Sequence, residues 1–458
     1  MVTAQPCVSV GADLRDRLER RTESDPTFWD FADSGARSGG HAYFQYPAMM
    51  VPELQGALLD DAVAAAPNIR RIYDPFVGSG TVLLESVYRG LSFHGTDINP
   101  MAILLCQVKA NPPQTTDAWR AARAVLTAAA DIEAGEIEFF GRDKWFVPSV
   151  LQDLLRLRQA IGKQRPRRTR RFLWVCLAET IRLVSNSRTS TVKLHIYAPD
   201  VLETRRPDAL RTFRDVVLAN CGHVEQHWAR FGARPEHDEA EPAGEPVVTL
   251  LQGSVDSRWT APKLADVLMT SPPYGDNSTT IPYGQHSYLP LQFIDPDDIP
   301  GGFDRSLIET THAIDHRSLG GSIREAEKAR ADLGAKSPAL ATYLKHLAGK
   351  PALEKKVLAF VRDYDRGFGA ALANLSPGGF AFLTLGERRV GGHTFPLVQV
   401  TQELLEARDQ TYVTTVERRL SRKRMAVRNS VGSTMATESI LVMQSPAAEI
   451  NGAEAQSA

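Results

Sequence analysis

The amino-acid sequence predicts an α/β protein built on one doubly wound, mostly parallel sheet that carries helical insertions. From residue 69 onward, short apolar stretches alternate with helical ones, which is the pattern of βαβ units. A glycine-rich turn, DPFVGSGT, separates the first of these strands from the first helix. Two polar, helix-rich segments, 113–245 and 285–370, then interrupt the alternation. These three observations predict the fold class.

The first strands and helices follow in order along the chain. IRRIYDP (69–75) and LSFHGTD (91–97) are the first two predicted strands. GTVLLESVYRG (80–90) is the helix between them, and Gly90 is well placed to end it. PMAILLCQVKAN (100–111) is a second helix with a proline in its first turn. This spacing of strand, helix and strand predicts neighbouring parallel strands.

Strand patterns resume after the first helix-rich segment. PVVTLLQ (246–252) and ADVLMTS (265–271) precede the second helix-rich segment, and GGFAFLTLG (378–386) follows it. TYVTTVE (411–417) and SILVMQ (439–444) are the last two strands, and we expect them to pair as antiparallel edge strands of the same sheet.

These patterns divide the chain into parts with different expected roles. The sheet domain is assembled from three separate segments, 41–112, 246–284 and 371–445. Residues 1–40 are expected to be irregular, and the small, polar tail 446–458 to be disordered. The remaining segments, 113–245 and 285–370, are the two helical insertions.

Composition limits the class of protein and its partners. The formal net charge of −1 over 458 residues neither indicates nor excludes a polyanionic partner, so any basic surface must be local. The four cysteines are far apart and form no CxxC pair, which argues against a structural zinc site or a disulfide framework and favours a reducing compartment. No apolar run reaches about 18 residues. We expect a soluble, cytoplasmic protein without a membrane partner.

The glycine-rich turn has the features of a nucleoside site. Gly78 and Gly80 allow a tight turn and a close approach of the backbone to a ligand. Asp74 ends the first strand, and Asp97 ends the second about 20 residues later, where a carboxylate can accept both hydroxyls of a ribose. No lysine stands in the turn, which disfavours a triphosphate. A plain strand-to-helix turn is the alternative for two glycines alone.

Three motifs together resemble a known family. DPFVGSGT (74–81), GTDINP (95–100) and TSPPY (270–274) are similar to the motifs of the amino-methyltransferases that modify exocyclic nitrogens of DNA bases. HAYFQYPAMMVPELQGALL (41–59) resembles the family segment that helps hold the methionine carboxylate. The resemblance implies a Rossmann-like methyltransferase sheet and S-adenosyl-L-methionine as cofactor. The implied cofactor-binding residues are Asp74, Pro75, Phe76, Gly78, Ser79, Gly80, Thr81, Asp97 and Ile98.

The Ser-Pro-Pro-Tyr stretch is the predicted catalytic corner of this family. An exocyclic amine is a poor nucleophile because its lone pair is delocalised into the base. If Ser271 Oγ and the Pro272 carbonyl accept its hydrogens, the lone pair becomes available. Pro272 and Pro273 keep these acceptors rigid. Tyr274 offers a face on which an extruded base can stack, as base flipping requires. A surface turn is the alternative for this tetrapeptide alone.

The serine at position 271 bears on the target base. Within the family, SPPY resembles the cytosine-N4 enzymes, whereas DPPY or NPPY is typical of adenine-N6 enzymes. The resemblance therefore implies a site-specific DNA methyltransferase acting on N4 of cytosine, in a restriction-modification or phage-defence system. Three alternatives stay open: a DNA adenine-N6 methyltransferase, an RNA guanine-N2 methyltransferase, and a non-catalytic nucleic-acid-binding module.

Double-stranded DNA is the expected partner, and a cognate restriction or defence nuclease is compatible with it. RPRRTRR (165–171) has five arginines in seven residues and is suited to cross a phosphate backbone, with a solvated loop as the alternative. The insertion 113–245 is the expected target-recognition region, in preference to 285–370. The candidate DNA-binding residues are Arg167, Arg168, Arg170, Arg171, Lys423 and Arg424.

Overall fold

The computed structural model describes residues 9–232, 246–255, 264–275, 281–420 and 436–448, which fold around a seven-stranded sheet. The strand order is β3-β2-β1-β4-β5-β9-β8. A separate two-stranded hairpin, β6 (Arg389–Val390) and β7 (His393–Thr394), follows β5. The bounds of the seven strands are β1 Arg71–Asp74, β2 Ser92–Asp97, β3 Val248–Gln252, β4 Ala265–Thr270, β5 Leu375–Leu385, β8 Thr411–Arg419 and β9 Thr437–Gln444.

The direction of the strands confirms the expected doubly wound, Rossmann-like sheet. Strands β3, β2, β1, β4 and β5 pair in parallel, whereas β9 pairs antiparallel with both β5 and β8. The last two strands therefore pair as expected, although only β8 is an edge strand. The chain moves from β1 to β2 on one side and later returns to place β4 on the other side of β1. Ligand sites of open α/β sheets lie at such a switch point.

Alternate residues of the central strands face two separate hydrophobic cores, because successive side chains of a strand point to opposite faces. In β4, Val267 and Met269 belong to one core and Leu268 to the other. In β5, Phe380 and Phe382 are in the first core, and their neighbours Ala381 and Leu383 are in the second. The sheet is thus buried on both faces, as near-continuous apolar strands predict.

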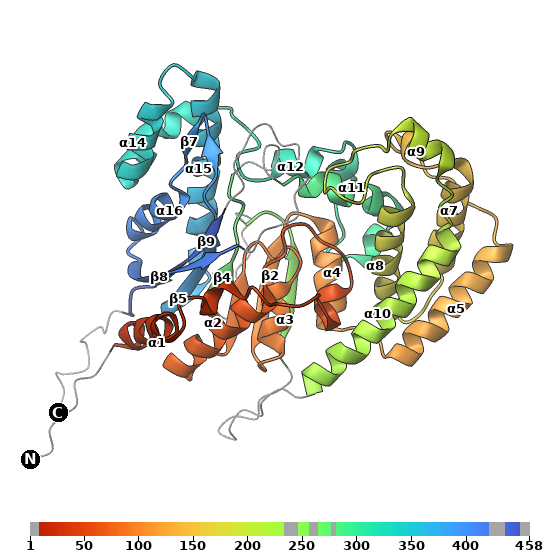
Figure 1. Ribbon diagram of the computed structural model, residues 1–458, viewed down its shortest axis with the longest axis horizontal. Helices are drawn as coiled ribbons and strands as arrows, with labels where there is room; N and C mark the ends of the chain where they lie inside the picture. Colours follow the sequence, from red (N-terminus) through yellow and green to blue (C-terminus); the bar gives the residue numbers. More distant parts are fainter. Residues whose placement is uncertain (1–8, 233–245, 256–263, 276–280, 421–435, 449–458) are drawn as a thin grey trace, which may run out of the picture.

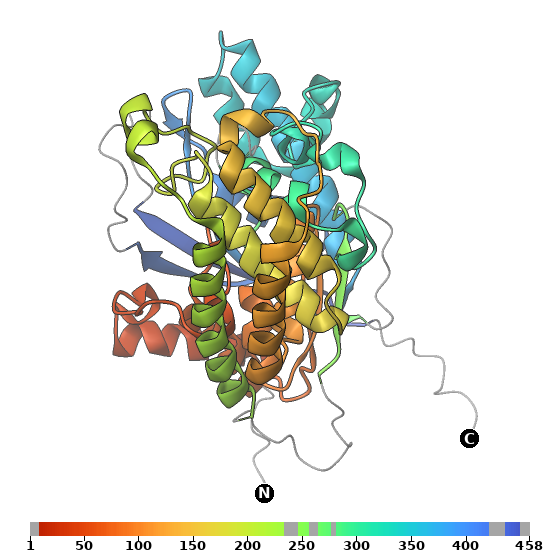
Figure 2. The same cartoon turned by 90° about the vertical axis from the view of Figure 1, so that its right-hand side faces the viewer.

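The first core is covered by the early helices and by the first insertion. Helices α2 (Pro52–Ala65), α3 (Thr81–Val87) and α4 (Pro100–Ala110) pack near the sheet, and the insertion adds a bundle beyond them (Figure 1). The long helices of this bundle run side by side (Figure 2). The helices of the insertion are α5 (Thr115–Asp131), α6 (Arg142–Trp145), α7 (Pro148–Gly162), α8 (Arg167–Val184), α9 (Pro199–Thr204) and α10 (Ala209–Gly232).

The second insertion is divided between the two faces. Helix α11 (Tyr283–Phe293) packs in the first core, while α14 (Pro338–His346) and α15 (Pro351–Leu372) pack in the second. Helix α15 leads directly into β5 and therefore serves as the crossover helix between the parallel strands β4 and β5. The remaining helices of this half are α12 (Ala313–Arg317), α13 (Arg330–Lys336) and α16 (Leu397–Glu406).

The expectation that residues 1–40 are irregular is wrong, because Val10–Ser24 form helix α1. Ser9 caps it by accepting a hydrogen bond from the Ala12 amide at 3.3 Å. Leu14 and Leu18, four residues apart, are fully buried on one face of the helix. The rest of α1 is rich in charged residues, so its sequence shows the apolar periodicity of a helix only at these two leucines.

The arginine-rich stretch is also not a loop, because α8 begins at Arg167. Arg170 donates from Nε and Nη2 to the two carboxylate oxygens of Asp298, at 2.6 and 2.5 Å. Arg171 Nε donates to the backbone carbonyl of Asp298 at 2.6 Å, and Trp174 Nε1 donates to its carboxylate at 2.7 Å. Asp298 is almost fully buried. This part of the arginine cluster therefore joins the two insertions to each other.

Part of the tail that was expected to be disordered is attached to the sheet. The amide of Gly378 donates to the Pro446 carbonyl at 2.9 Å, and the Ser445 amide donates to Gly379 at 2.8 Å. Residues 449–458 of the expected tail lie outside the described ranges. Among the described helices, none combines the length and the apolar character that a membrane span requires.

Candidate active site

A cavity of about 460 Å³ lies at the carboxyl ends of β1, β2 and β4, at the switch point of the sheet. Its wall brings together the glycine-rich turn (74–81) and the proline corner (271–274), which are almost 200 residues apart in the chain. All four predicted catalytic residues line it. Six predicted cofactor residues do so as well: Pro75, Phe76, Gly78, Ser79, Asp97 and Ile98. The other three, Asp74, Gly80 and Thr81, are buried and are not part of the lining.

The conformation of the glycine-rich turn requires its glycines. Gly78 and Gly80 have φ angles of +47° and +72°, which side chains with a Cβ rarely adopt. A Cβ on Gly80 would also lie 2.8 Å from the sulfur of Cys106 on α4. The turn is therefore held against α4 without space for a side chain at this point.

Asp97 holds the turn from the end of the neighbouring strand. Its Oδ2 accepts a hydrogen bond from the Gly78 amide, and its Oδ1 accepts one from the Asn99 amide, both at 2.8 Å. Burial raises the pKa of Asp97 to about 6, although the two amides act in the opposite direction. Each carboxylate oxygen keeps acceptor capacity beyond these single bonds, and the residue lines the cavity.

Asp74 joins the glycine-rich turn to the strand that carries the proline corner. Its Oδ1 accepts hydrogen bonds from Thr270 Oγ1 at 2.6 Å and from the Phe76 amide at 3.0 Å. Thr270 immediately precedes Ser271, so one oxygen fixes both walls of the cavity. Asp74 Oδ2 is buried and has no hydrogen-bond partner in the described part of the chain. Burial raises the pKa of Asp74 to about 7.

The proline corner is connected to the antiparallel edge of the sheet. Ser271 Oγ lies 3.1 Å from the Tyr274 hydroxyl, which in turn donates to Glu438 Oε1 at 3.3 Å. Arg418 Nη1 lies 3.6 Å from Glu438 Oε2. Burial raises the pKa of Tyr274 well above its ordinary value, so its hydroxyl keeps its proton. Glu438 and Arg418 also line the cavity, and the sequence motifs identified neither of them.

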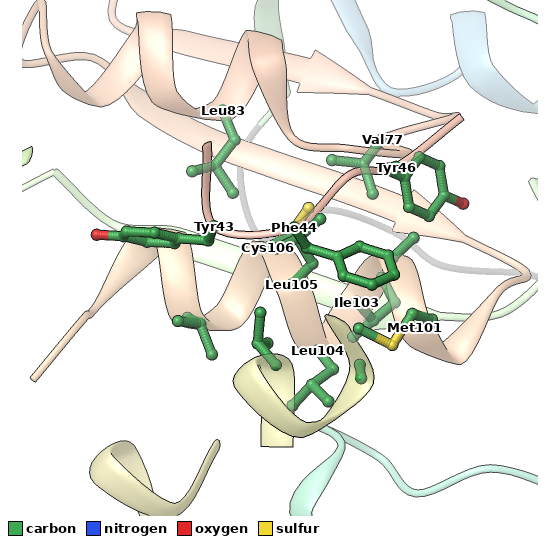
Figure 3. Close-up of a cluster of buried hydrophobic side chains, with 14 of the residues drawn as sticks. Tyr43, Phe44, Tyr46, Val77, Leu83, Met101, Ile103, Leu104, Leu105 and Cys106 are labelled. Carbon is green, nitrogen blue, oxygen red and sulfur yellow. The ribbon is translucent and has the colours of Figure 1, made fainter. Parts of the chain in front are cut away.

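Segment 41–59 forms a third wall of the cavity. Figure 3 shows how its aromatic residues pack in the hydrophobic core beside that wall. Phe44 packs over the apolar side chains of α4, and Tyr46 lies beside Val77 of the glycine-rich turn. The Tyr46 ring stacks on Tyr283 with centroids 5.8 Å apart, and its hydroxyl accepts a hydrogen bond from Asn99 at 3.0 Å. Tyr46 and Tyr283 both line the cavity. Tyr46 belongs to segment 41–59, which the resemblance places beside the cofactor, but neither tyrosine was named individually as a site residue.

A buried lysine supports the turn from below. Lys109 Nζ donates to the Ser79 carbonyl at 2.7 Å, and burial lowers the pKa of Lys109 to about 7. No local sequence pattern indicates this contact, because Lys109 lies on α4, 30 residues after Ser79. Within the described ranges, no cluster of three histidine, cysteine or acidic side chains is arranged to hold a metal ion.

The predicted DNA-binding residues lie away from the cavity or outside the described ranges. Arg167, Arg168, Arg170 and Arg171 are on α8 and do not line it, and Lys423 and Arg424 fall in the undescribed stretch 421–435. No described residue of the first insertion lines the cavity. The second insertion contributes Ile314, Arg317, Ser318, Leu319, Asp363 and Arg366 to the cavity lining, and Ile281 and Tyr283, which directly precede this insertion, line it as well.

We predict that Thr270→Val lowers the free energy of unfolding by about 1–3 kcal/mol, because the Asp74 carboxylate loses a buried donor without a change in side-chain volume. Thr270→Ser keeps the hydroxyl and is the matched control. Urea unfolding of the three proteins measures the difference. Equal losses in the valine and serine variants would show that the hydrogen bond to Asp74 contributes nothing.

Comparison with known proteins gives one extended match. The chain is 27% identical over 456 aligned residues to the Type II methyltransferase M.MvaI of Kocuria varians. The match covers 94% of this chain and 96% of that protein, so both insertions are included in it. No family model matches the chain. The chain is therefore similar, over nearly all of its length, to a Type II methyltransferase, and its Rossmann-like fold is consistent with that similarity.

Proposed function

We propose that this protein is an S-adenosyl-L-methionine-dependent DNA methyltransferase that modifies the exocyclic N4 of cytosine. The observation that carries the proposal is the single cavity that joins the glycine-rich turn and Asp97 to the proline corner. A methyl donor and an amine acceptor must meet at such a junction. The similarity to M.MvaI along almost the whole chain supports a DNA methyltransferase.

The residues around the turn fit an adenosyl ligand with little negative charge. The Asp97 carboxylate faces the cavity and suits a ribose diol, while Phe76 and Ile98 offer apolar surface for a base. The turn itself has no lysine side chain for a triphosphate, and Lys109 is committed to the Ser79 carbonyl beneath it. When bound here, S-adenosyl-L-methionine supplies a methyl group on a positively charged sulfur.

At the proline corner, Ser271 Oγ and the Pro272 carbonyl are proposed to accept the two hydrogens of the target amine. This makes the nitrogen lone pair available for direct attack on the methyl carbon. The new C–N bond would form as the methyl–sulfur bond breaks and leaves its electron pair on sulfur, and the methylated amine would then release one proton to solvent. Pro272 and Pro273 hold the acceptors in place, and the Tyr274 ring is proposed to stack on the extruded base.

The choice of cytosine N4 follows the neutral serine at the corner, as in the SPPY enzymes that the chain resembles. The leading alternative is adenine N6, because a serine hydroxyl can accept from either amine. Guanine N2 of RNA is the third candidate. By the same resemblance, we propose that the activity belongs to a restriction-modification or phage-defence system, with which a cognate nuclease is compatible.

We further propose that DNA reaches the cavity across the second insertion. Arg317 and Arg366 line the cavity, and their side chains are 46% and 64% exposed. The sequence favoured the first insertion, but Arg170 and Arg171 there are bound to the buried Asp298. Arg317 and Arg366 also have acidic neighbours, Asp304 at 3.6 Å and Asp363 at 3.8 Å, but much of each side chain stays exposed. Exposed cations on the wall of this cavity are suited to contact phosphates that flank an extruded base.

The modified base is predicted to be N4-methylcytosine. DNA incubated with the purified protein and methyl-labelled S-adenosyl-L-methionine is digested to nucleosides and analysed by mass spectrometry. Ser271→Ala should reduce label in the product by roughly 10²-fold, by analogy with the loss of one preorganised polar partner. Label found only in N6-methyladenine would overturn the base assignment, and unlabelled DNA would contradict the proposed activity.

Cofactor affinity should depend on the ionisation of Asp97. Its pKa of about 6 means that the carboxylate is charged above this pH and loses acceptor strength below it. Calorimetry should therefore show weaker binding of S-adenosyl-L-methionine as the pH falls from 7 through about 6. Asp97→Asn should bind several-fold more weakly at pH 7, and Asp117→Asn on the exposed face of α5 should not. Unchanged affinity in Asp97→Asn would remove Asp97 from the ribose site.

The DNA surface is tested by a pair of double variants. Arg317→Ala/Arg366→Ala should weaken duplex binding and lower the salt slope by about 1–2 units, because each phosphate contact contributes slightly less than one. Arg211→Ala/Arg214→Ala on α10 of the first insertion is the matched control, since these arginines are also well exposed. Fluorescence anisotropy at several salt concentrations measures both quantities. If the α10 variants weakened duplex binding more than Arg317→Ala/Arg366→Ala, the DNA-binding surface would lie on the first insertion.

A further inference from the structure

A row of hydrogen-bonded side chains begins at the proline corner and ends at the antiparallel edge of the sheet. This hydrogen-bonded chain runs from Ser271 to Tyr274 and then to Glu438, which faces Arg418. Arg418 and Glu438 are direct cross-strand neighbours on β8 and β9. Their side chains are only 7% and 15% exposed, so water has little access to them. The methyl-transfer steps described above do not use either residue.

The chemistry of the groups fixes the direction of every hydrogen bond in this chain. A carboxylate beside a guanidinium accepts hydrogen bonds and donates none. The single proton of Tyr274 is therefore directed to Glu438. The Tyr274 oxygen then accepts the single proton of Ser271. As a result, the Ser271 oxygen presents only lone pairs to the cavity.

We propose that Glu438, supported by Arg418 and acting through Tyr274, is a positioning residue that sets the Ser271 hydroxyl as a hydrogen-bond acceptor. An acceptor at this point favours a base that presents an N–H of an exocyclic amine. It disfavours a base with a carbonyl oxygen in the same position, because two acceptors would then face each other. Glu438 thereby contributes to substrate choice without touching the reacting atoms.

This inference rests on the proposed function, because it concerns whether the Ser271 hydroxyl of the same site accepts or donates a hydrogen bond. A serine hydroxyl without this chain rotates freely and can donate as well as accept. An amine is then bound in a less favourable arrangement for part of the time. We therefore expect weaker binding and methylation of the base, and an unchanged affinity for the methyl donor, whose proposed site is the opposite wall of the cavity.

The decisive variant is Glu438→Gln, which keeps the shape of the side chain but adds an amide donor. The amide can donate to Tyr274, whose proton then turns to Ser271, and Ser271 becomes a donor toward the cavity. We expect kcat for DNA methylation to fall by about 10-fold to 100-fold. The Kd for S-adenosyl-L-methionine should stay within about twofold of the wild-type value. Glu417→Gln, on the neighbouring strand and exposed, is the matched control.

A double variant separates positioning from general damage to the site. Tyr274→Phe keeps the ring for stacking and removes only the hydroxyl. Because Glu438 acts through that hydroxyl, Glu438→Gln/Tyr274→Phe should lose no more activity than Tyr274→Phe alone. If the fold-losses in kcat of the two single variants multiplied in the double variant, Glu438 would act by a route other than the Tyr274 hydroxyl, and the proposal would be overturned.

Substrate choice provides a readout that a merely structural role would not change. Duplexes carry the sequence methylated by the wild-type protein, with either cytosine or uracil at the target position, so that an amine is exchanged for a carbonyl. The wild-type protein should bind the cytosine duplex more tightly, and Glu438→Gln should reduce this preference. An unchanged preference and an unchanged kcat in Glu438→Gln would overturn the inference while the methyltransferase activity stands. A wild-type protein without methyltransferase activity would contradict the proposed function and the inference with it.

Discussion

The hydrogen bond between Asp74 and Thr270 determines the geometry on which the rest of the site depends. Asp74 ends β1 and Thr270 ends β4, and these are the two parallel strands that flank the switch point of the sheet. The glycine-rich turn begins directly after the first residue, and the proline corner begins directly after the second. A single buried carboxylate oxygen thus sets the separation of the two walls. Its burial also explains why the pKa of Asp74 is raised to about 7.

The layers of the protein keep this junction rigid from both sides. Alternate residues of β4 and β5 enter two different cores, so neither strand can shift without disturbing both. One core continues into the bundle of the first insertion, and the other holds the crossover helix α15. The two insertions are joined in turn by Arg170 and Asp298. The cavity therefore lies where segment 41–59, the glycine-rich turn and the proline corner are held together.

Most of the sheet and much of the site could be predicted from local patterns. The strand–turn–helix order, the glycines with positive φ and the carboxylate of Asp97 are properties of short segments, and the structure has them at the expected positions. Helix α1 was missed because only Leu14 and Leu18 mark its buried face. Lys109, Glu438 and Asp298 were missed for another reason. Their partners lie 30, 164 and 128 residues away, and no local periodicity records such contacts.

In the proposed enzyme, one cavity holds the methyl donor against the proline corner. A crystal structure of the protein with S-adenosylhomocysteine, the product of methyl transfer, tests this most directly. We expect the ribose hydroxyls to bind the Asp97 carboxylate and the sulfur to face Ser271 across the cavity. A ligand bound elsewhere, or one whose sulfur points away from the proline corner, would contradict this account.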